Sequence, residues 1–275
     1  MPLKPALLAC LLLVLGATHA RPVEAGAWMR SEGSGLVRAS VATSSASSRW
    51  DNDRKLSSAP CTRHRQSIGV HAEYGYSYYR TLFASAELGS RQCSDDNTVS
   101  GVSDLTVGMR GRLDPFRNGR TWEAALKLPI SGTTADPDRP GNGEFGLDLG
   151  VHFSLSPDPY DHVRTRGGVW SWGTGVRVWS GGLAHQAWGY GGWSRRLNED
   201  WGFSTRLSGT LSFGGHEKHA DGIRRNDYDK LTANASLRRN ITRSLGVSVG
   251  LSQDIQGRNT DRATRLRLSV SHSWR

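Results

Sequence analysis

The stretch Phe145-Gly-Leu-Asp-Leu-Gly-Val-His-Phe-Ser-Leu155 alternates large apolar residues with glycine, serine and ionisable residues. The stretch Ser67-Ile-Gly-Val-His-Ala-Glu-Tyr-Gly-Tyr76 has the same pattern. Because successive side chains of a β-strand point to opposite faces of the sheet, a period of two predicts strands with one apolar and one polar face. The two stretches indicate an all-β chain whose strands separate two different environments.

The alternation recurs along the chain and predicts about twelve strands, each near the roughly 9 to 11 residues with which a tilted strand crosses a bilayer. Further strands are expected around residues 82–88, 105–112, 122–128, 201–213, 230–238, 245–251 and 265–274, with weaker ones at 37–43, 170–178 and 188–190. The long segment 156–167 and the short segment 180–183 interrupt the regular order of connections. Ten or fourteen strands therefore stay open as alternatives.

The apolar faces carry no arginine at mid-strand, although five lysines among 35 basic residues leave 30 arginines in the chain. A lysine or arginine facing lipid at mid-depth costs roughly 2–4 kcal/mol, so this exclusion favours a lipid-facing surface. Aromatic residues lie toward strand ends, as an interfacial girdle requires: Trp122, Trp201, Phe213 and Trp274. These features favour a transmembrane antiparallel up-and-down β-barrel, with a soluble β-sandwich as the alternative fold.

Composition excludes several other classes of protein. The mean hydropathy is −0.51, and the one long apolar run is too short and too isolated for a polytopic helical membrane protein. The formal net charge is +10. Because the arginines are scattered over the whole chain and form neither a basic tail nor a cluster, no nucleic-acid partner is expected.

The first twenty residues have the pattern of an export signal. Lys4 precedes the apolar run 6–15, and Thr18-His19-Ala20 supplies small residues where a signal peptidase cleaves. We expect a signal peptide at 1–20 and an outer-membrane barrel at 21–275, in a Gram-negative bacterium. Cys10 imitates a lipidation site, but the apolar run continues past it to Leu15, which disfavours a lipoprotein.

With both chain ends in the periplasm, connections should alternate between short inner turns and long outer loops. Cys61 and Cys93 then fall in the first two outer loops, where an oxidising compartment allows a disulfide; two free thiols are the alternative. The expected outer loops are 44–65, 90–102, 131–142, 214–227 and 253–262, and the expected inner turns are 77–80, 114–119, 195–200 and 239–243.

The polar faces predict which residues point into the barrel. Basic residues outnumber acidic ones there, so a water-filled lumen would favour anionic solutes. The alternative is that these charges pair with one another and fill a small barrel. The expected inward residues are Arg38, His71, Glu73, Glu87, Arg110, Arg112, Glu123, Lys127, Asp148, His152, Arg177, Arg206, Lys230, Arg238, Arg265 and Arg267.

No arrangement of residues points to catalysis. Histidines are spread over several strands, serines are everywhere, and no spacing selects a catalytic triad. His216 and His219 with Asp221 could hold a metal ion, but they lack the helix and third ligand of specific metal motifs. We expect no enzyme activity, no metal and no cofactor.

Three segments resemble a known family of barrels: Gly101-Val-Ser-Asp-Leu-Thr-Val-Gly-Met-Arg-Gly-Arg-Leu113, Ala125-Leu-Lys-Leu-Pro-Ile-Ser-Gly132 and Gly141-Asn-Gly-Glu-Phe-Gly-Leu-Asp-Leu-Gly150. They are similar to the MetA-pathway phenol-degradation family of outer-membrane barrels. The start of the chain, with Ala27-Trp28 and Gly33-Ser-Gly35, looks like related barrels encoded beside exopolysaccharide and biofilm genes. The resemblance implies an outer-membrane barrel that moves small molecules or supports polymer export, and it carries over no functional residue.

Two functions follow as expectations. The first is a passive channel or transport component for small polar, anionic or aromatic solutes. The second is an envelope interaction protein with a closed lumen, which supports exopolysaccharide export or adhesion through its outer loops. The expected partners are outer-membrane lipid and either small solutes or polysaccharide.

Overall fold

The computed structural model describes residues 29–93, 99–102, 105–114, 119–130, 144–155, 168–214 and 227–275. The expected export signal at 1–20, with Cys10, lies outside these residues, as does the segment holding His216, His219 and Asp221. Within the described ranges, no helix combines the length and apolar character needed to cross a membrane.

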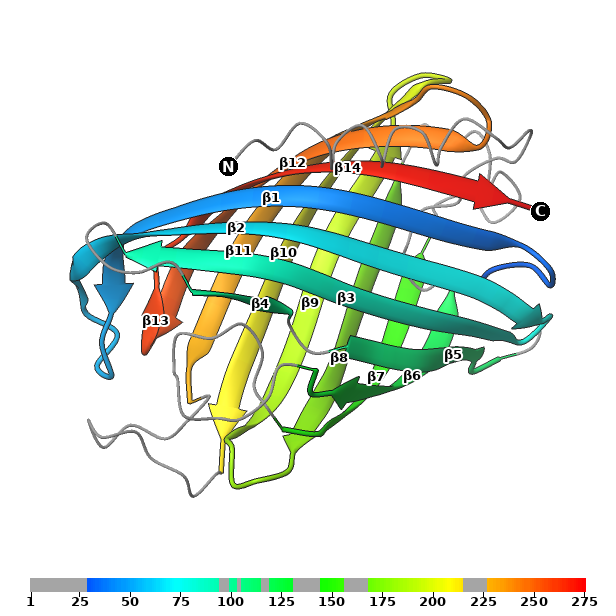
Figure 1. The fold of residues 1–275 in the computed structure, drawn as a ribbon. Coiled ribbons are helices and arrows are strands. Elements are labelled where there is room, and N and C mark those ends of the chain that lie inside the picture. The colour runs from blue at the N-terminus through cyan, green and yellow to red at the C-terminus, as the bar shows by residue number, and fades with distance from the viewer. Residues whose placement is uncertain are drawn as a thin grey trace.

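The described strands form one closed antiparallel barrel (Figure 1). β1 pairs with β14 on one side and with β2 on the other, which leaves the sheet without a free edge. The long strands, twelve in the described ranges as predicted, are β1 (Gly35–Trp50), β2 (Leu56–Ser77), β3 (Arg80–Cys93), β5 (Leu105–Arg112), β6 (Arg120–Leu128), β7 (Gly146–Leu155), β8 (Val169–Trp179), β9 (His185–Arg196), β10 (Trp201–Phe213), β11 (Asp229–Asn240), β12 (Leu245–Arg258) and β14 (Thr264–Trp274). Two short strands, β4 (Val99–Val102) and β13 (Thr260–Asp261), pair with β3 and β1.

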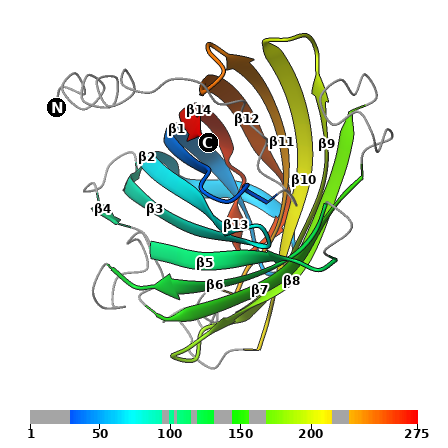
Figure 2. The same ribbon diagram turned by 90° about the vertical axis from the view of Figure 1, so that its right-hand side faces the viewer.

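The apolar faces point outward and the polar faces point inward, around the interior seen in Figure 2. Val70, Leu126 and Leu268 are about half exposed, whereas Glu73 and Thr81 are buried. A soluble sandwich would bury the first set and expose the second, so the sandwich alternative is wrong. The outward band of leucine, valine and aromatic side chains instead fits contact with lipid.

Glycines make room for a large side chain inside the barrel. A Cβ at Gly175 would lie 2.3 Å from the Leu149 carbonyl oxygen and 2.4 Å from the Trp188 ring, and one at Gly150 would lie 2.5 Å from the same ring. Trp188 on β9 therefore reaches across β8 toward β7 only because both glycines lack a side chain. This close approach positions Trp188 beside the charged residues described below.

Three of the predicted outer loops are wrong, because strands continue through them. The predicted loop 90–102 contains the end of β3, including Cys93, and all of β4. The predicted loop 44–65 is mostly β1 and β2, joined by a tight turn in which Asp51 N donates to the Lys55 carbonyl oxygen over 3.0 Å. The predicted loop 253–262 contains the end of β12 and all of β13. Apolar alternation marks only the part of a strand that faces lipid, whereas backbone pairing holds these strands together beyond it.

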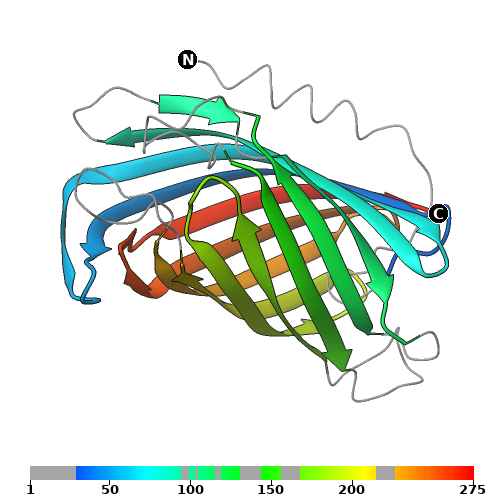
Figure 3. The ribbon, with the colours of Figure 1, turned by 90° about the horizontal axis from the view of Figure 1, so that it is seen from below.

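The other connections follow the expected order where the structure describes them. The links 77–80, 195–200 and 239–243 are short turns, and 180–184 connects β8 to β9 in a short turn as the sequence suggested. The segments 94–98, 131–143, 156–167 and 215–226 lie outside the described residues. Seen from below, the strands run obliquely across the barrel (Figure 3), as closure of a sheet into a barrel requires.

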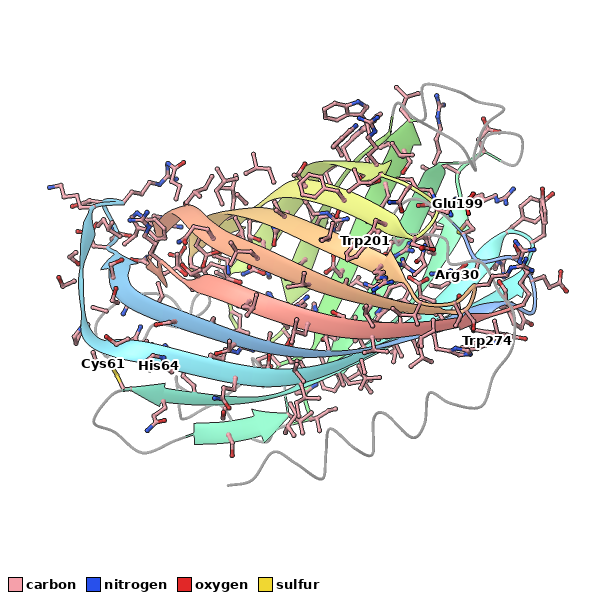
Figure 4. The ribbon with its side chains drawn as sticks, turned by 90° about the horizontal axis from the view of Figure 1, so that it is seen from above. Arg30, Cys61, His64, Glu199, Trp201 and Trp274 are labelled. Atoms are coloured by element: carbon pink, nitrogen blue, oxygen red, sulfur yellow. A yellow bond between two sulfur atoms is a disulfide. The ribbon has the colours of Figure 1, made fainter. Side chains whose placement is uncertain are left out.

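A disulfide joins Cys61 to Cys93, with 5.7 Å between their Cα atoms. Figure 4 shows Cys61 at the barrel end opposite to Arg30 and Trp274. With the chain ends in the periplasm, the disulfide lies at the outer end, which we call the outer mouth. The end that holds Arg30 is the periplasmic mouth.

The outward band makes a direct prediction about stability. Changing Leu268 to arginine places a cation against lipid near the middle of β14, and we expect it to lower the free energy of unfolding by roughly 2–4 kcal/mol. The matched control is Ser269→Arg, whose side chain faces the lumen on the same strand and is expected to cost less than half as much. Urea unfolding in lipid vesicles, followed by tryptophan fluorescence, gives both values, and equal losses would contradict a lipid-facing Leu268.

Candidate functional site

A chain of ion pairs crosses the inner wall near the periplasmic mouth. Arg30 Nε donates to Glu73 Oε2 over 2.7 Å, and Arg110 Nη1 lies 3.7 Å from Glu73 Oε1. Arg110 Nη2 donates in turn to Glu123 Oε2 over 2.7 Å, and His152 Nε2 lies 3.4 Å from the same oxygen. We call these five residues the ion-pair belt; it links β2, β5, β6 and β7 to the segment before β1.

The chain segment before β1 is held inside this mouth. Gly33 N donates to the Gly75 carbonyl oxygen over 2.9 Å, and Gly75 N donates to the Ser34 carbonyl oxygen over 2.8 Å. Arg30 N donates to Thr81 Oγ1 over 2.9 Å. Arg30 thus anchors residues 29–34 through both its backbone and its charged side chain, which narrows the periplasmic mouth on the β2 side.

A second charged cluster surrounds Asp148 on β7. Arg177 donates to Asp148 Oδ2 through Nη2 over 2.6 Å and through Nε over 2.9 Å, and Trp188 Nε1 donates to Oδ1 over 2.6 Å. Arg177 Nη1 also donates to Gln186 Oε1 over 3.1 Å. Three strands are cross-linked inside the barrel by this one carboxylate.

A tyrosine extends the belt to β10. His152 Nδ1 and Tyr190 Oη lie 3.0 Å apart, and the Arg206 guanidinium stacks over the Tyr190 ring at 4.5 Å from its centre. His71 Nε2 lies 3.2 Å from Glu73 Oε1 at the other end of the belt. Large interacting side chains therefore cover the inner wall from β2 round to β10.

The opposite inner wall is lined mostly by small side chains. Strands β1, β12 and β14 present serine, glycine or alanine at most inward positions, as β11 does at Ser236, and their outward neighbours Leu251 and Leu266 are exposed. Small residues fill less of the interior than arginine, glutamate or tryptophan do. These inward small residues are Ser40, Ala42, Ser44, Ser236, Gly246, Ser248, Gly250, Ser252, Ser269, Ser271 and Ser273.

The lumen has more cations than its carboxylates can pair. Glu73, Glu87, Glu123 and Asp148 each bind an arginine. In the part of the chain that the structure describes, no ion pair involves Arg206, Arg265, Arg267 or Lys230. Arg206 and Arg267 are exposed even though they face the interior, so water reaches them inside the barrel.

The remaining predicted inward residues also lie on the polar face, in differing surroundings. Arg65 Nη2 donates to Glu87 Oε1 over 2.7 Å, and Lys127 Nζ donates to Thr106 Oγ1 over 3.2 Å. Arg112 stacks over Tyr78 at 4.4 Å, at the periplasmic rim and not in the lumen proper. Arg38 is paired in register with His71, and Arg238 lies beside Gly246.

Sequence reasoning missed several inward residues that complete the site. Phe83, Trp188 and Tyr190 are aromatic, and they contact Arg110, Asp148 and Arg206 inside the barrel. Leu36 is inward and buried. The only available signal was their position in the alternation of each strand, which places them on the same face as the charged residues. Aromatic and leucine side chains were instead expected on the lipid face.

A third group of charges ties the turns at the outer mouth. Arg258 donates to Asp227 over 2.6 Å and to Asp229 over 2.9 Å, and Arg54 donates to Asp229 over 2.9 Å. Asp229 lies beyond Leu231, the last lipid-facing residue of β11. Burial would raise the pKa of Asp229, but hydrogen bonds from Arg258, the Ser212 amide and Arg54 lower it to about 2, so the carboxylate stays charged into strong acid.

The described residues contain no group of three or more His, Cys, Asp or Glu side chains that could hold a metal ion. The charged clusters instead consist of carboxylates held by arginines. Such clusters can fix a wall in place and set the electrostatic potential of a lumen.

The protein was compared with known families and structures. No family model matches the sequence, and no curated protein matches it either, so the resemblance to the phenol-degradation family stays a prediction. An outer-membrane channel from Pseudomonas putida F1 superimposes with a TM-score of 0.72 at 15% identity, covering 92% of this chain and 100% of that chain. The translocator domain of the autotransporter NalP from Neisseria meningitidis gives a TM-score of 0.52 at 11% identity, covering 88% of this chain and 89% of that one. The chain has the fold of Gram-negative outer-membrane β-barrels.

Proposed function

We propose that this barrel is a passive outer-membrane channel for small polar anions. The observation that carries the proposal is the set of inward cations without an ion pair among the described residues: Arg206, Arg265, Arg267 and Lys230. Because none of the four forms an ion pair in the described part of the chain, they give the lumen a positive potential that concentrates anions.

The distribution of side chains supports a channel over a fully plugged barrel. The bulky ion-pair belt and the Asp148 cluster cover one wall, whereas β1, β12 and β14 present mostly small residues. Serine hydroxyls supply most of the polar side-chain groups on the inner wall of β12 and β14, at Ser248, Ser252, Ser269, Ser271 and Ser273. This lining favours polar over aromatic solutes.

The test is single-channel recording in planar bilayers with the purified mature protein. We expect discrete open steps and, under a tenfold KCl gradient, a reversal potential of the sign that reports chloride preference. The matched control is protein denatured by heating in detergent before reconstitution, which should give no steps. Silence from correctly folded protein would contradict the channel and favour an interaction protein with a closed lumen.

A further inference from the structure

Six inward residues on neighbouring strands form one continuous row. Backbone pairing places Arg206 opposite Asn234, Asn234 opposite Ser252, and Ser252 opposite Arg265. It continues by placing Arg265 opposite Ser44 and Ser44 opposite Arg65. We call Arg206, Asn234, Ser252, Arg265, Ser44 and Arg65 the arginine row.

The arginine row rises from the periplasmic side of the lumen toward the outer mouth. At its β10 end, backbone pairing places Arg206 opposite Gly192 and Gly192 opposite Ser171, near the periplasmic start of β8. At its β2 end, backbone pairing places Arg65 opposite Arg91, which lies two residues before the disulfide-bonded Cys93. Because the strands are tilted, a line of paired residues rises around the barrel, and this one connects the two mouths.

The row of inward residues next to the arginine row, on its periplasmic side, consists mostly of small residues. Paired residues there are Ser204, Ser236, Gly250, Arg267 and Ala42. Arg267 is the one large side chain among these five, and it adds a further exposed cation next to Arg265. The guanidinium groups of the arginine row therefore lie beside side chains that are mostly smaller than their own.

The charges of the row are incompletely matched by protein groups. Arg265 interacts unfavourably with Arg65 and Arg267, and the acidic groups that attract it are Glu87 and Asp254. Glu87 is already bound by Arg65 over 2.7 Å, and Asp254 accepts a hydrogen bond from Thr232 Oγ1 over 2.6 Å. An external anion would relieve the repulsion among these arginines.

The spacing of the row selects the kind of anion. At about 4.8 Å per strand, Arg206 and Arg265 are separated by roughly 14 Å of wall and Arg265 and Arg65 by roughly 10 Å. Asn234, Ser252 and Ser44 lie between them and offer amide and hydroxyl groups. A small inorganic anion would contact one end of this pattern only, whereas a ligand with separated carboxylates and hydroxyls between them can follow it.

We propose that the arginine row is a binding track for a short chain of acidic sugars, with carboxylates at the arginines and hydroxyl groups at Asn234, Ser252 and Ser44. This inference rests on the proposed function and names the solute class that the same lumen takes. Carboxylates bind guanidinium groups through paired hydrogen bonds, and sugar hydroxyls both donate to and accept from amide and serine side chains.

The test measures block of the ionic current by trigalacturonate added on the side of the outer mouth. We expect resolvable blockades by trigalacturonate at concentrations where maltotriose, its neutral counterpart, and sulfate, a compact anion, cause none. Because a hydrogen-bonded charge contributes about 1.5–3 kcal/mol, the double variant Arg265→Ser/Arg267→Ser should weaken the block about tenfold or more. Arg243→Ser, which removes one charge from the exposed turn between β11 and β12, should leave the block unchanged.

The outcomes separate this inference from the proposed function. The binding track is wrong, and the channel is unaffected, if the protein is an anion-preferring channel that trigalacturonate blocks no better than sulfate does. The same holds if trigalacturonate blocks the double variant as well as the wild-type protein.

If the folded protein conducts no current, the channel is wrong, and calorimetric titration of the detergent-solubilised protein with trigalacturonate then decides the track. Binding that is lost in the double variant supports the track; absence of binding to the wild-type protein overturns it. The gel mobility shift on heating shows that each variant is folded.

Discussion

Replacing Glu73 with alanine is expected to lower the free energy of unfolding by roughly 3–5 kcal/mol, the loss typical of removing one partner from a buried ion pair. Glu73 is 3% exposed, and its two carboxylate oxygens hold Arg30, His71 and Arg110. Without the carboxylate, two guanidinium groups remain inside the barrel with less compensation for their lost hydration. The side-chain anchor of residues 29–34 is lost at the same time, and only their backbone hydrogen bonds to Gly75 and Thr81 remain.

The matched control is Glu87→Ala, which also removes an inward glutamate bound to an arginine. The Glu87 and Arg65 side chains are 32% and 42% exposed, so their pair is screened by water and its loss should cost about 0–1 kcal/mol. Urea unfolding in lipid vesicles measures both variants on the same scale. A loss for Glu73→Ala as small as that for Glu87→Ala would show that the ion-pair belt does not stabilise the barrel. Glu73→Gln removes the charge but keeps the size of the side chain. It should restore less than half of the free energy of unfolding that Glu73→Ala loses.

The fold could be predicted from the sequence because successive residues of a membrane β-strand alternate between lipid and the lumen, so that apolar and polar side chains alternate too. In β2, for example, Val70 and Tyr74 face outward and are exposed, while Glu73 between them faces inward and is buried. The same alternation is the basis on which the lumen-facing residues were predicted. It failed at 44–65, where β1 and β2 continue without a regular apolar alternation and are held by backbone pairing, by the Cys61–Cys93 disulfide and by ion pairs such as Arg65–Glu87.

The partners within the lumen could not be predicted, because parity gives the face of a residue and not its neighbours around the ring. Glu73 on β2 meets Arg110 on β5 across the intervening β3, and His152 on β7 meets Tyr190 on β9 across β8. The second contact depends on Gly173, where a Cβ would lie 2.7 Å from the tyrosine ring and 2.8 Å from His152 Nδ1. Such contacts need the register and curvature of the whole barrel, which a linear pattern does not contain.

Reversing two charges of the lumen should reverse its ion preference. The double variant Arg265→Glu/Arg267→Glu changes the charge at one point of the inner wall by four units, and we expect the chloride-to-potassium permeability ratio to fall about tenfold or more, to below one. Arg65 on β2 would gain a carboxylate on β14, one strand beyond its neighbour β1, so the variant should fold. The reversal potential under a tenfold KCl gradient measures the ratio.

Chloride preference has two possible sources, the total charge of the protein and the local charge of the inward arginines. A variant with the same change in net charge outside the lumen distinguishes them. Arg243→Glu/Arg275→Glu makes the same change in net charge at exposed positions near the periplasmic mouth, outside the lumen. Exposed charges are screened over about 8–10 Å at physiological salt, so this control should keep the chloride preference. If both double variants shift the reversal potential equally, selectivity arises from the total charge of the protein and the inward arginines have no special role. A shift confined to Arg265→Glu/Arg267→Glu places the selecting charge on the inner wall of β14, where a permeating ion passes within reach of the guanidinium groups.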